Sequence, residues 1–269
     1  MENLPKNKIR NLEDDGRAGE SRQCAKMKGM RKMSRAAREQ KRMNRAEQVE
    51  RDGYAIVPAV VDELVVRDLL EQLGGSDLPR SRAGVRHMMK DPRVAQIAAR
   101  EEMIGIAREI VGAKAWPFRA TLFDKSPSSN WLVAWHQDTA LPLRERRELP
   151  RWGPWSVKEG MNYAHAPREA LERVVALRLH LDDSNENNGP LRVLPGTHQS
   201  GVLTDEEVLH LAEKISGVEC LVAQGGVVIM RPLVIHASSK ATSERPRWVL
   251  HIEYASTEEI AEGLALTVA

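Results

Sequence analysis

The chain changes periodicity near Trp116, and this change limits its fold more than any other feature of the sequence. Ahead of Trp116, apolar residues recur at helical spacing, whereas beyond it apolar and polar residues alternate, as they do in half-buried strands. Alternation is strictest over residues 247–255. The apolar positions there, which would share one face of a strand, are Trp248, Leu250, Ile252 and Tyr254. Helices followed by seven or eight short strands predict a mainly β protein with flanking helices (α+β), built as a β-sandwich or jelly roll.

Two helical segments are expected ahead of the strands, over residues 62–75 and 91–112. Each opens on an aspartate and closes on glycine, which are common boundary residues of helices. The second also has a proline in its first turn, where the missing N–H costs nothing. We expect both segments to serve as scaffold. A further connection, residues 139–165, is rich in tryptophan and proline and is expected to be a long irregular loop beside a site.

Composition divides the chain into a basic arm (1–50), a folded domain (51–256) and a C-terminal tail (257–269). Residues 22–45 hold ten basic residues and one acidic residue, with little apolar surface to bury. Three interpretations of the arm stay open: a solvated, largely disordered segment, an upstream extension ahead of a true start at Met33 or Met43, or a contact for nucleic acid or another acidic partner. The basic run lacks interleaved aromatic residues, so nucleic-acid binding is not favoured.

The cysteines and the hydropathy pattern predict a cytoplasmic protein. Cys24 and Cys220 are too few for a disulfide framework and lack metal-ligand spacing. No apolar run approaches the roughly 20 residues that a membrane-spanning helix needs, and the N-terminus has no hydrophobic signal core. We therefore expect no membrane partner. The oligomeric state is left open by the sequence.

A candidate metal site begins with His136 and Asp138. Residues two apart on a strand point to the same side, so this pair places an imidazole beside a carboxylate. His236 follows an apolar run late in the β region and is the best third ligand. Two histidines and one carboxylate can bind one face of an octahedral Fe(II) and leave three positions open. A lone His-x-Asp pair also occurs by chance, and a lone histidine in an apolar context is often simply a core residue.

Arg247 and Ser238 add a second signal, because both can bind an acid. Arg247 opens the strand that follows His236, and its planar guanidinium can hold a carboxylate end-on. A guanidinium is costly to bury without an anion, so an inward-pointing arginine implies an acidic ligand. Ser238 lies two residues beyond His236, on the same face, and can add a hydrogen bond to that carboxylate.

Together these residues resemble the phytanoyl-CoA dioxygenase family. The resemblance rests on four ordered motifs: His136-Gln137-Asp138, then Asn188-Gly189-Pro190-Leu191 with Leu194-Pro195-Gly196-Thr197-His198, then His236-x-Ser238, and Arg247. It implies a double-stranded β-helix (jelly roll, cupin-like) core and a dioxygenase that uses Fe(II), 2-oxoglutarate and O₂. It also implies iron on His136, Asp138 and His236. For 2-oxoglutarate it implies Arg247 and Ser238, with Thr121 and Arg178 at other cosubstrate-contacting positions of the family.

The resemblance implies hydroxylation of a small organic substrate, coupled to oxidative decarboxylation of 2-oxoglutarate to succinate and CO₂. Related halogenases replace the carboxylate ligand by a small residue, so the presence of Asp138 favours a hydroxylase. Trp135, Trp155 and Gln137 are the residues we expect beside the substrate, although packing of a long loop explains the tryptophans equally well. The alternatives are a cupin-like metal- or ligand-binding protein without oxygenase turnover and a nucleic-acid-associated factor that depends on the basic arm. The sequence does not identify the substrate.

Overall fold

The long alternating segments form one five-stranded antiparallel sheet. The computed structural model describes residues 44–78, 84–126 and 129–269. In this larger sheet the strand order is β1 (Tyr54–Val57), β10 (Val227–Met230), β7 (Val174–His180), β12 (Arg247–Ala255) and β2 (Trp116–Lys125). The bounds of β12 are those that the alternation predicts. The part of the basic arm up to residue 43 lies outside the described residues, so the expectations for it are not tested.

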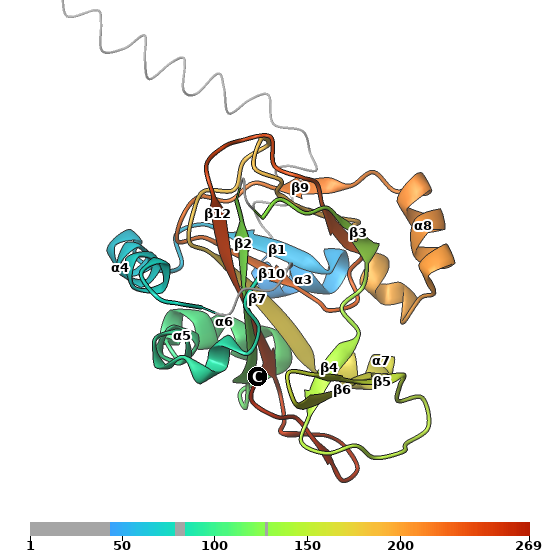
Figure 1. The fold of residues 1–269 in the computed structure, drawn as a ribbon. Helices are drawn as coiled ribbons and strands as arrows, with labels where there is room; N and C mark the ends of the chain where they lie inside the picture. Colours follow the sequence, from blue (N-terminus) through green and yellow to red (C-terminus); the bar gives the residue numbers. More distant parts are fainter. Residues whose placement is uncertain (1–43, 79–83, 127–128) are drawn as a thin grey trace, which may run out of the picture. The chain divides into compact units, whose positions relative to one another are not determined.

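The outer face of the larger sheet is apolar and is covered by helices. Leu250 and Tyr254 of β12 are fully buried in the cluster formed by α3 (Arg45–Asp52), α4 (Glu63–Gly74), α5 (Pro92–Ala98) and α6 (Glu101–Val111). Figure 1 shows α4, α5 and α6 together on one side of this sheet. The helix expected over residues 91–112 is broken into α5 and α6, because Arg100 takes an extended conformation and starts a new helix. The acidic residues in the first turn of α6, Glu101 and Glu102, suit such a helix start.

A smaller four-stranded antiparallel sheet faces the inner side of the larger one. Its order is β3 (Val133–His136), β11 (His236–Ser238), β8 (Leu191–Val193) and β9 (Val218–Cys220). Apolar side chains from both sheets share one buried layer, in which Val228 and Met230 of β10 meet Leu191 and Val193 of β8. Two antiparallel sheets packed in this way confirm the predicted jelly roll. Helix α8 (Asp205–Lys214) lies against β3, as Figure 1 also shows.

Residues 139–165 were expected to be irregular, but they contain a third antiparallel sheet. Its order is β4 (Ala140–Leu143), β6 (Met161–His165) and β5 (Trp155–Lys158). Each strand has four or five residues, and β4 contains Pro142, so alternation is too short to be read from the sequence. The short helix α7 (Arg168–Leu171) follows, and the remaining helical turns are η1 (Met88–Lys90) and η2 (Thr197–Ser200).

The two ends of the expected domain need correction. Helix α3 starts at Arg45, inside the expected arm; Asn44 caps it, and its Val49 is buried in the main core. The expected tail forms the hairpin β13 (Glu259–Ala261) and β14 (Leu264–Ala265), and Leu264 is buried. Beyond it, Ala269 exchanges backbone hydrogen bonds with the β2 residues Phe118 and Ala120. Apolar burial and strand pairing therefore continue past residue 256. Within the described residues, no helix is long and apolar enough to cross a membrane.

Candidate metal centre and active site

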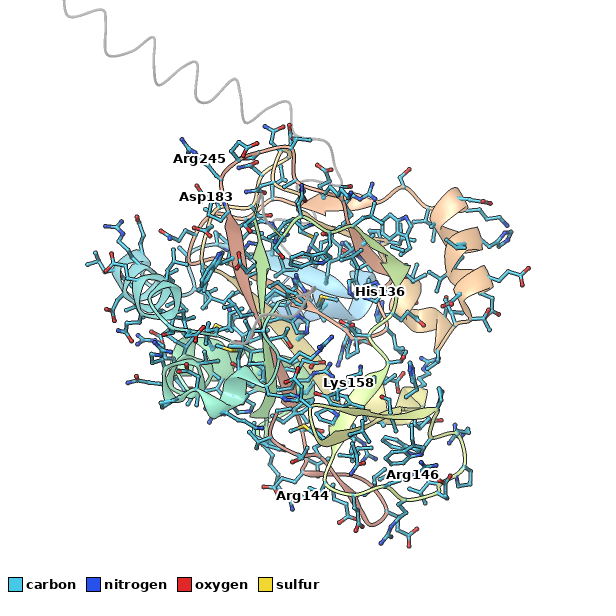
Figure 2. The ribbon with its side chains drawn as sticks, in the orientation of Figure 1. His136, Arg144, Arg146, Lys158, Asp183 and Arg245 are labelled. Carbon is cyan, nitrogen blue, oxygen red and sulfur yellow. The ribbon has the colours of Figure 1, made fainter. Side chains whose placement is uncertain are left out.

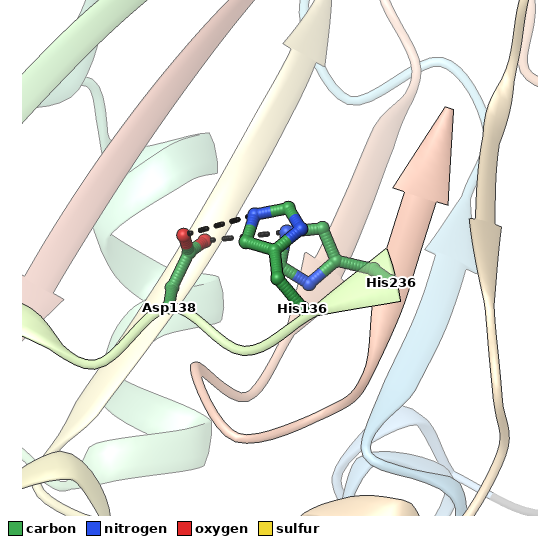
Figure 3. A group of neighbouring side chains, drawn as sticks. All are labelled: His136, Asp138 and His236. Atoms are coloured by element: carbon green, nitrogen blue, oxygen red, sulfur yellow. Dashed lines mark ion pairs between the residues drawn. The ribbon is translucent and has the colours of Figure 1, made fainter. Parts of the chain in front are cut away.

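His136, Asp138 and His236 meet at the edge of the smaller sheet. His136 ends β3 and His236 begins β11, and the two are direct partners in the antiparallel pairing of these strands. Asp138 follows β3, where its backbone N–H donates to the carbonyl of Pro232 (2.9 Å). Its carboxylate lies 3.7 Å from His136 Nε2 and 3.5 Å from His236 Nε2 (Figure 3). One candidate ligand atom from each residue lies within 4.8 Å of the others.

Backbone carbonyls fix which nitrogen of each imidazole points into the site. His136 Nδ1 lies 2.9 Å from the carbonyl oxygen of Ala134, and His236 Nδ1 lies 3.0 Å from that of Val234. A carbonyl oxygen can only accept a hydrogen bond, so the proton sits on Nδ1 and the lone pair of Nε2 faces Asp138. Metal-binding histidines are commonly oriented in this way.

The protonation states of His236 and Asp138 suit a cation. Burial lowers the pKa of His236 to about 4, although Asp138 opposes the shift, so this imidazole is neutral near pH 7. Burial raises the pKa of Asp138, but the imidazoles of His236 and His136 outweigh it and hold that pKa well below its usual range. Two imidazoles and one ionised carboxylate are the donor set of a facial Fe(II) site. Within the described part of the chain, this is the one cluster with metal-ligand geometry.

A cavity of about 330 Å³ opens beside the three residues, and we call it the cosubstrate cavity. Three buried cations line it: Lys125 of β2, Arg178 of β7 and Arg247 of β12. Ser238 lies on the same wall and accepts a hydrogen bond from Lys125 Nζ (2.6 Å). Within the described residues, none of the three cations forms an ion pair with a carboxylate of the chain. A cavity with this lining is suited to an acid.

The three cations lie close enough that neighbouring positive charges disfavour the charged forms of Lys125 and Arg247. Burial, together with the smaller effects of Arg247 and Arg178, lowers the pKa of Lys125 to about 7. Burial also lowers the pKa of Arg178 and of Arg247 to about 10. An anionic ligand would relieve both the desolvation and the mutual repulsion.

A tight turn holds Arg247 in place. Its guanidinium donates to the carbonyl oxygens of Asn188 (Nε, 3.0 Å) and Gly189 (Nη2, 2.9 Å). Gly189 has a φ of +65°, and a Cβ at this position would lie 2.3 Å from the carbonyl oxygen of Ser239 and 3.0 Å from Lys125 Nζ. Only glycine fits this close approach without strain. The Asn188-Gly189-Pro190 motif thus positions Arg247 at the cosubstrate cavity.

A smaller cavity of about 150 Å³ lies next to the first. It shares Arg86, Phe123 and Asp138 with the cosubstrate cavity. Its other lining residues are Arg119, Thr121, Lys158, Tyr163 and His251. Asp138 therefore stands between the two cavities, and Thr121, which we expected at the cosubstrate, lines only the smaller one.

The three residues expected beside the substrate line neither cavity and have other partners. Strand alternation turns Trp135 and Gln137 away from His136 and Asp138. Trp135 packs under α8, and Gln137 bonds to the backbone of Gly201, Leu233 and Leu203. Trp155 packs at the edge of the apolar cluster around the small third sheet. The structure therefore does not bring these three side chains to either cavity.

Lys125, Lys158 and Tyr163 were not found from the sequence. Lys125 has a signal that could have been read: it continues the alternation of Arg119, Thr121 and Phe123 on one face of β2. It also pairs with Arg247 across the sheet. Lys158 and Tyr163 come from the small third sheet, whose strands are too short to show a period.

Comparison with known proteins places the chain in a family. The profile described as "Phytanoyl-CoA dioxygenase (PhyH)" matches residues 49–249. L-proline trans-4-hydroxylase of Streptomyces griseoviridis is 24% identical over 242 residues, which cover 76% of this chain and 82% of the relative. Ectoine dioxygenase of Stutzerimonas stutzeri (strain A1501) is 27% identical over 169 residues, covering 57% of this chain and 49% of the relative.

Solved structures share the fold. EctD from S. alaskensis with 2-oxoglutarate and 5-hydroxyectoine superimposes with a TM-score of 0.60 at 18% identity, covering 78% of this chain and 74% of that one. The epimerase SnoN in complex with Fe3+, alpha ketoglutarate and nogalamycin RO gives a TM-score of 0.62 at 18% identity, covering 87% of each chain. At these identities the likeness concerns the fold alone.

Proposed function

This chain belongs to the phytanoyl-CoA dioxygenase family and is therefore an Fe(II)- and 2-oxoglutarate-dependent dioxygenase, and we propose that it hydroxylates a small organic molecule with His136, Asp138 and His236 as the iron ligands. Arg247 and Ser238 bind the distal carboxylate of 2-oxoglutarate in this proposal, assisted by Lys125 and Arg178. The observation that carries it is the meeting of the three candidate ligands with a cationic cavity large enough for a dicarboxylate.

The bound Fe(II), with 2-oxoglutarate and O₂, supplies an oxidation that yields succinate, CO₂ and a hydroxylated substrate. The residues of the chain hold and orient the reactants. The carbonyls of Ala134 and Val234 keep the two Nε2 lone pairs aimed at one point, and Asp138 contributes the negative charge that a divalent cation needs.

The cosubstrate cavity orients 2-oxoglutarate by charge. Arg247 is fixed by the turn at Asn188-Gly189, so its guanidinium meets a carboxylate without first having to be ordered. Lys125 and Arg178 add positive charge at 99% and 92% burial, where a carboxylate is bound more strongly than in water. Because these cations face the triad within one cavity, the other end of the dicarboxylate can lie at the ligand cluster.

Asp138 also bears on the type of reaction. A halogenase of this class needs a free coordination position where Asp138 supplies a carboxylate, so halogenation is disfavoured. A cupin-like binding protein without turnover would explain the ligand cluster, but it gives no reason for a dicarboxylate cavity next to it. That alternative predicts metal binding without succinate formation.

Anaerobic reconstitution tests the proposal. The full chain is mixed with Fe(II) and 2-oxoglutarate without O₂, and the weak visible charge-transfer band of the chelated cosubstrate is recorded. Succinate is then measured after air is admitted. We expect the band and slow succinate release in the wild type and neither in Asp138→Ala.

His210→Ala is the matched control, since His210 is exposed on α8, outside both cavities. It should keep the band. Absence of the band in the wild type, or an unchanged band in Asp138→Ala, would show that these residues are not the iron site.

A further inference from the structure

The smaller cavity is the part of the site that binding of 2-oxoglutarate at Arg247 leaves free. It shares Asp138 with the cosubstrate cavity but contains none of Lys125, Arg178 and Arg247. A ligand in it would therefore lie on the other side of Asp138 from the cosubstrate. Its volume is about 150 Å³, and a cavity of about that volume in another protein binds benzene. The space suits one ring or a short aliphatic chain.

Two different sheets provide most of the walls of this cavity. The inner face of the larger sheet provides Thr121 and Phe123 of β2 and His251 of β12, and the small third sheet provides Lys158 and Tyr163. In the view of Figure 2, Lys158 lies below His136, beside the small sheet. Two aromatic rings and a threonine methyl group give the cavity apolar surface for a carbon skeleton.

Most charged groups of this cavity already have partners within the chain. Arg119 forms a buried ion pair with Glu253 and donates to the carbonyl of Ala140. Arg86 lies 3.7 Å from Glu159, and both side chains are more than a third exposed. Glu159 also lies 3.2 Å from His87 Nδ1. Asp138 is committed to the iron in the proposed function.

Lys158 is the exception. Within the described residues, its ammonium forms no hydrogen bond and no ion pair, and its one polar contact is the face of the Tyr163 ring, 4.8 Å from the ring centroid. Burial lowers its pKa, and Arg119 and Arg86 lower it further. Thr121 has no hydrogen-bond partner for its hydroxyl within the same residues, and it lines the same cavity. A partly buried ammonium and a free hydroxyl in one small cavity are suited to a carboxylate.

We propose, resting on the function proposed above, that the substrate is a small carboxylic acid whose carboxylate binds Lys158. Arg86 lies at the edge of the cavity and adds positive charge. The apolar skeleton of the acid lies along Phe123 and Tyr163, and its reacting C–H bond lies at the end of the cavity formed by Asp138. The size of the cavity excludes the whole of a coenzyme A thioester from it.

The test uses the full chain loaded with Fe(II) and 2-oxoglutarate without O₂. Each acid of a panel is compared with its primary amide, which has nearly the same shape but lacks the negative charge of the carboxylate. The panel holds L-proline, L-pipecolate, cyclohexanecarboxylate and benzoate. Binding is measured by calorimetry and by the change of the visible band, and succinate release is then followed in air. We expect at least one acid to bind, and its amide to bind at least about 10-fold more weakly, because a charge-assisted hydrogen bond is lost.

Variants at one position then identify the contact. Lys158→Met should weaken the binding of that acid at least about 10-fold, and Lys158→Arg, which keeps the charge, should restore most of it. Lys214→Met, an exposed change on α8, is the matched control and should bind the acid as the wild type does. Circular dichroism and thermal unfolding check that each variant is folded.

The outcomes separate this inference from the proposed function. If the visible band forms in the wild type but no acid of the panel binds, or amides bind as well as acids, the carboxylate inference is overturned and the proposed function stands. Equal binding by Lys158→Met and the wild type overturns it as well. If the band itself does not form, the proposed function fails first.

Discussion

The two faces of strand β12 have different roles: the outer face contributes to stability, and the inner face lines the candidate active site. The outer face carries Trp248, Leu250, Ile252 and Tyr254 into the main apolar core. The inner face carries Arg247 into the cosubstrate cavity and His251 into the smaller cavity. Both faces are buried, so burial alone does not distinguish them.

The difference lies in what burial does to each face. Apolar side chains stabilise the fold when they leave water, whereas guanidinium and ammonium groups destabilise it until an anion binds. The outer face therefore stabilises the fold without any ligand, whereas the buried charges of the inner face are compensated only when an anion binds. Substitutions in the apolar core and substitutions in the lining of the cosubstrate cavity should have opposite signatures, which gives four ways to test the comparison.

His236→Ala should have the largest effect, and on function alone. Loss of one of the three proposed ligands should lower the affinity for Fe(II) by more than about 100-fold, beyond the effect known for groups that merely orient ligands. Succinate formation should then vanish, while the urea midpoint of the metal-free protein changes little. Metal content after dialysis and urea unfolding followed by circular dichroism measure the two quantities. Normal iron content in this variant would contradict the ligand assignment.

Leu250→Ala should reverse that signature. Leu250 is fully buried between the larger sheet and the helices, so the change leaves a cavity and lowers the free energy of unfolding by about 2–5 kcal/mol. The folded fraction should still bind Fe(II) and 2-oxoglutarate as the wild type does. Chemical denaturation, with the visible band recorded at denaturant concentrations below the unfolding transition, checks both points. Loss of the band in fully folded protein would show that the outer face also contributes to ligand binding.

Arg247→Met should weaken the binding of 2-oxoglutarate by about 10- to 100-fold, since one charge-assisted contact contributes roughly 1.5–3 kcal/mol. The iron affinity without cosubstrate should stay close to that of the wild type. Arg245→Met is the control, because Arg245 is exposed two residues away and labelled at the periphery in Figure 2. Titration of the visible band with 2-oxoglutarate gives the cosubstrate affinity, and metal content after dialysis without cosubstrate reports the iron affinity. Equal effects of the two substitutions would remove Arg247 from the cosubstrate site.

Lys125→Met should show the smallest effect, as a change in pH dependence. The pKa of Lys125 falls from 10.5 to about 7 in the folded protein. Between these values the unfolded chain binds more protons, so the unliganded wild type gains stability as the pH rises above 7, by at most about 1.4 kcal/mol per pH unit. The variant should lack this gain. Urea unfolding of the ligand-free protein at pH 7, 8 and 9 measures the two slopes, and parallel slopes would mean that Lys125 is not an uncompensated cation.

Much of the site could be predicted because alternation assigns side chains to faces. The residues His136, Asp138, Ser238 and Arg247 lie on strands, or beside them, whose period is readable, and the structure brings them to one cavity. The same rule would have excluded Trp135 and Gln137, which occupy the opposite positions to His136. Aromatic content suggested a substrate wall there, but side-chain direction decides it.

The rest depended on tertiary contacts that no local pattern encodes. Lys158 and Tyr163 lie in a sheet whose strands are too short to be recognised, and only its packing against the larger sheet brings them near Asp138. The C-terminal hairpin was missed for a similar reason: its strands have three and two residues, and the backbone pairing of Ala269 with β2 has no sequence signal.

The direct pairing of His136 with His236 has a consequence for the mechanics of the smaller sheet. A metal ion bound by both would cross-link two strands that are a hundred residues apart in the chain, and so close a long loop. Iron would then act as a clasp as well as a reagent: its loss should let β3 and β11 separate while β12 stays paired. Hydrogen exchange in these two strands would report whether a given molecule carries its metal.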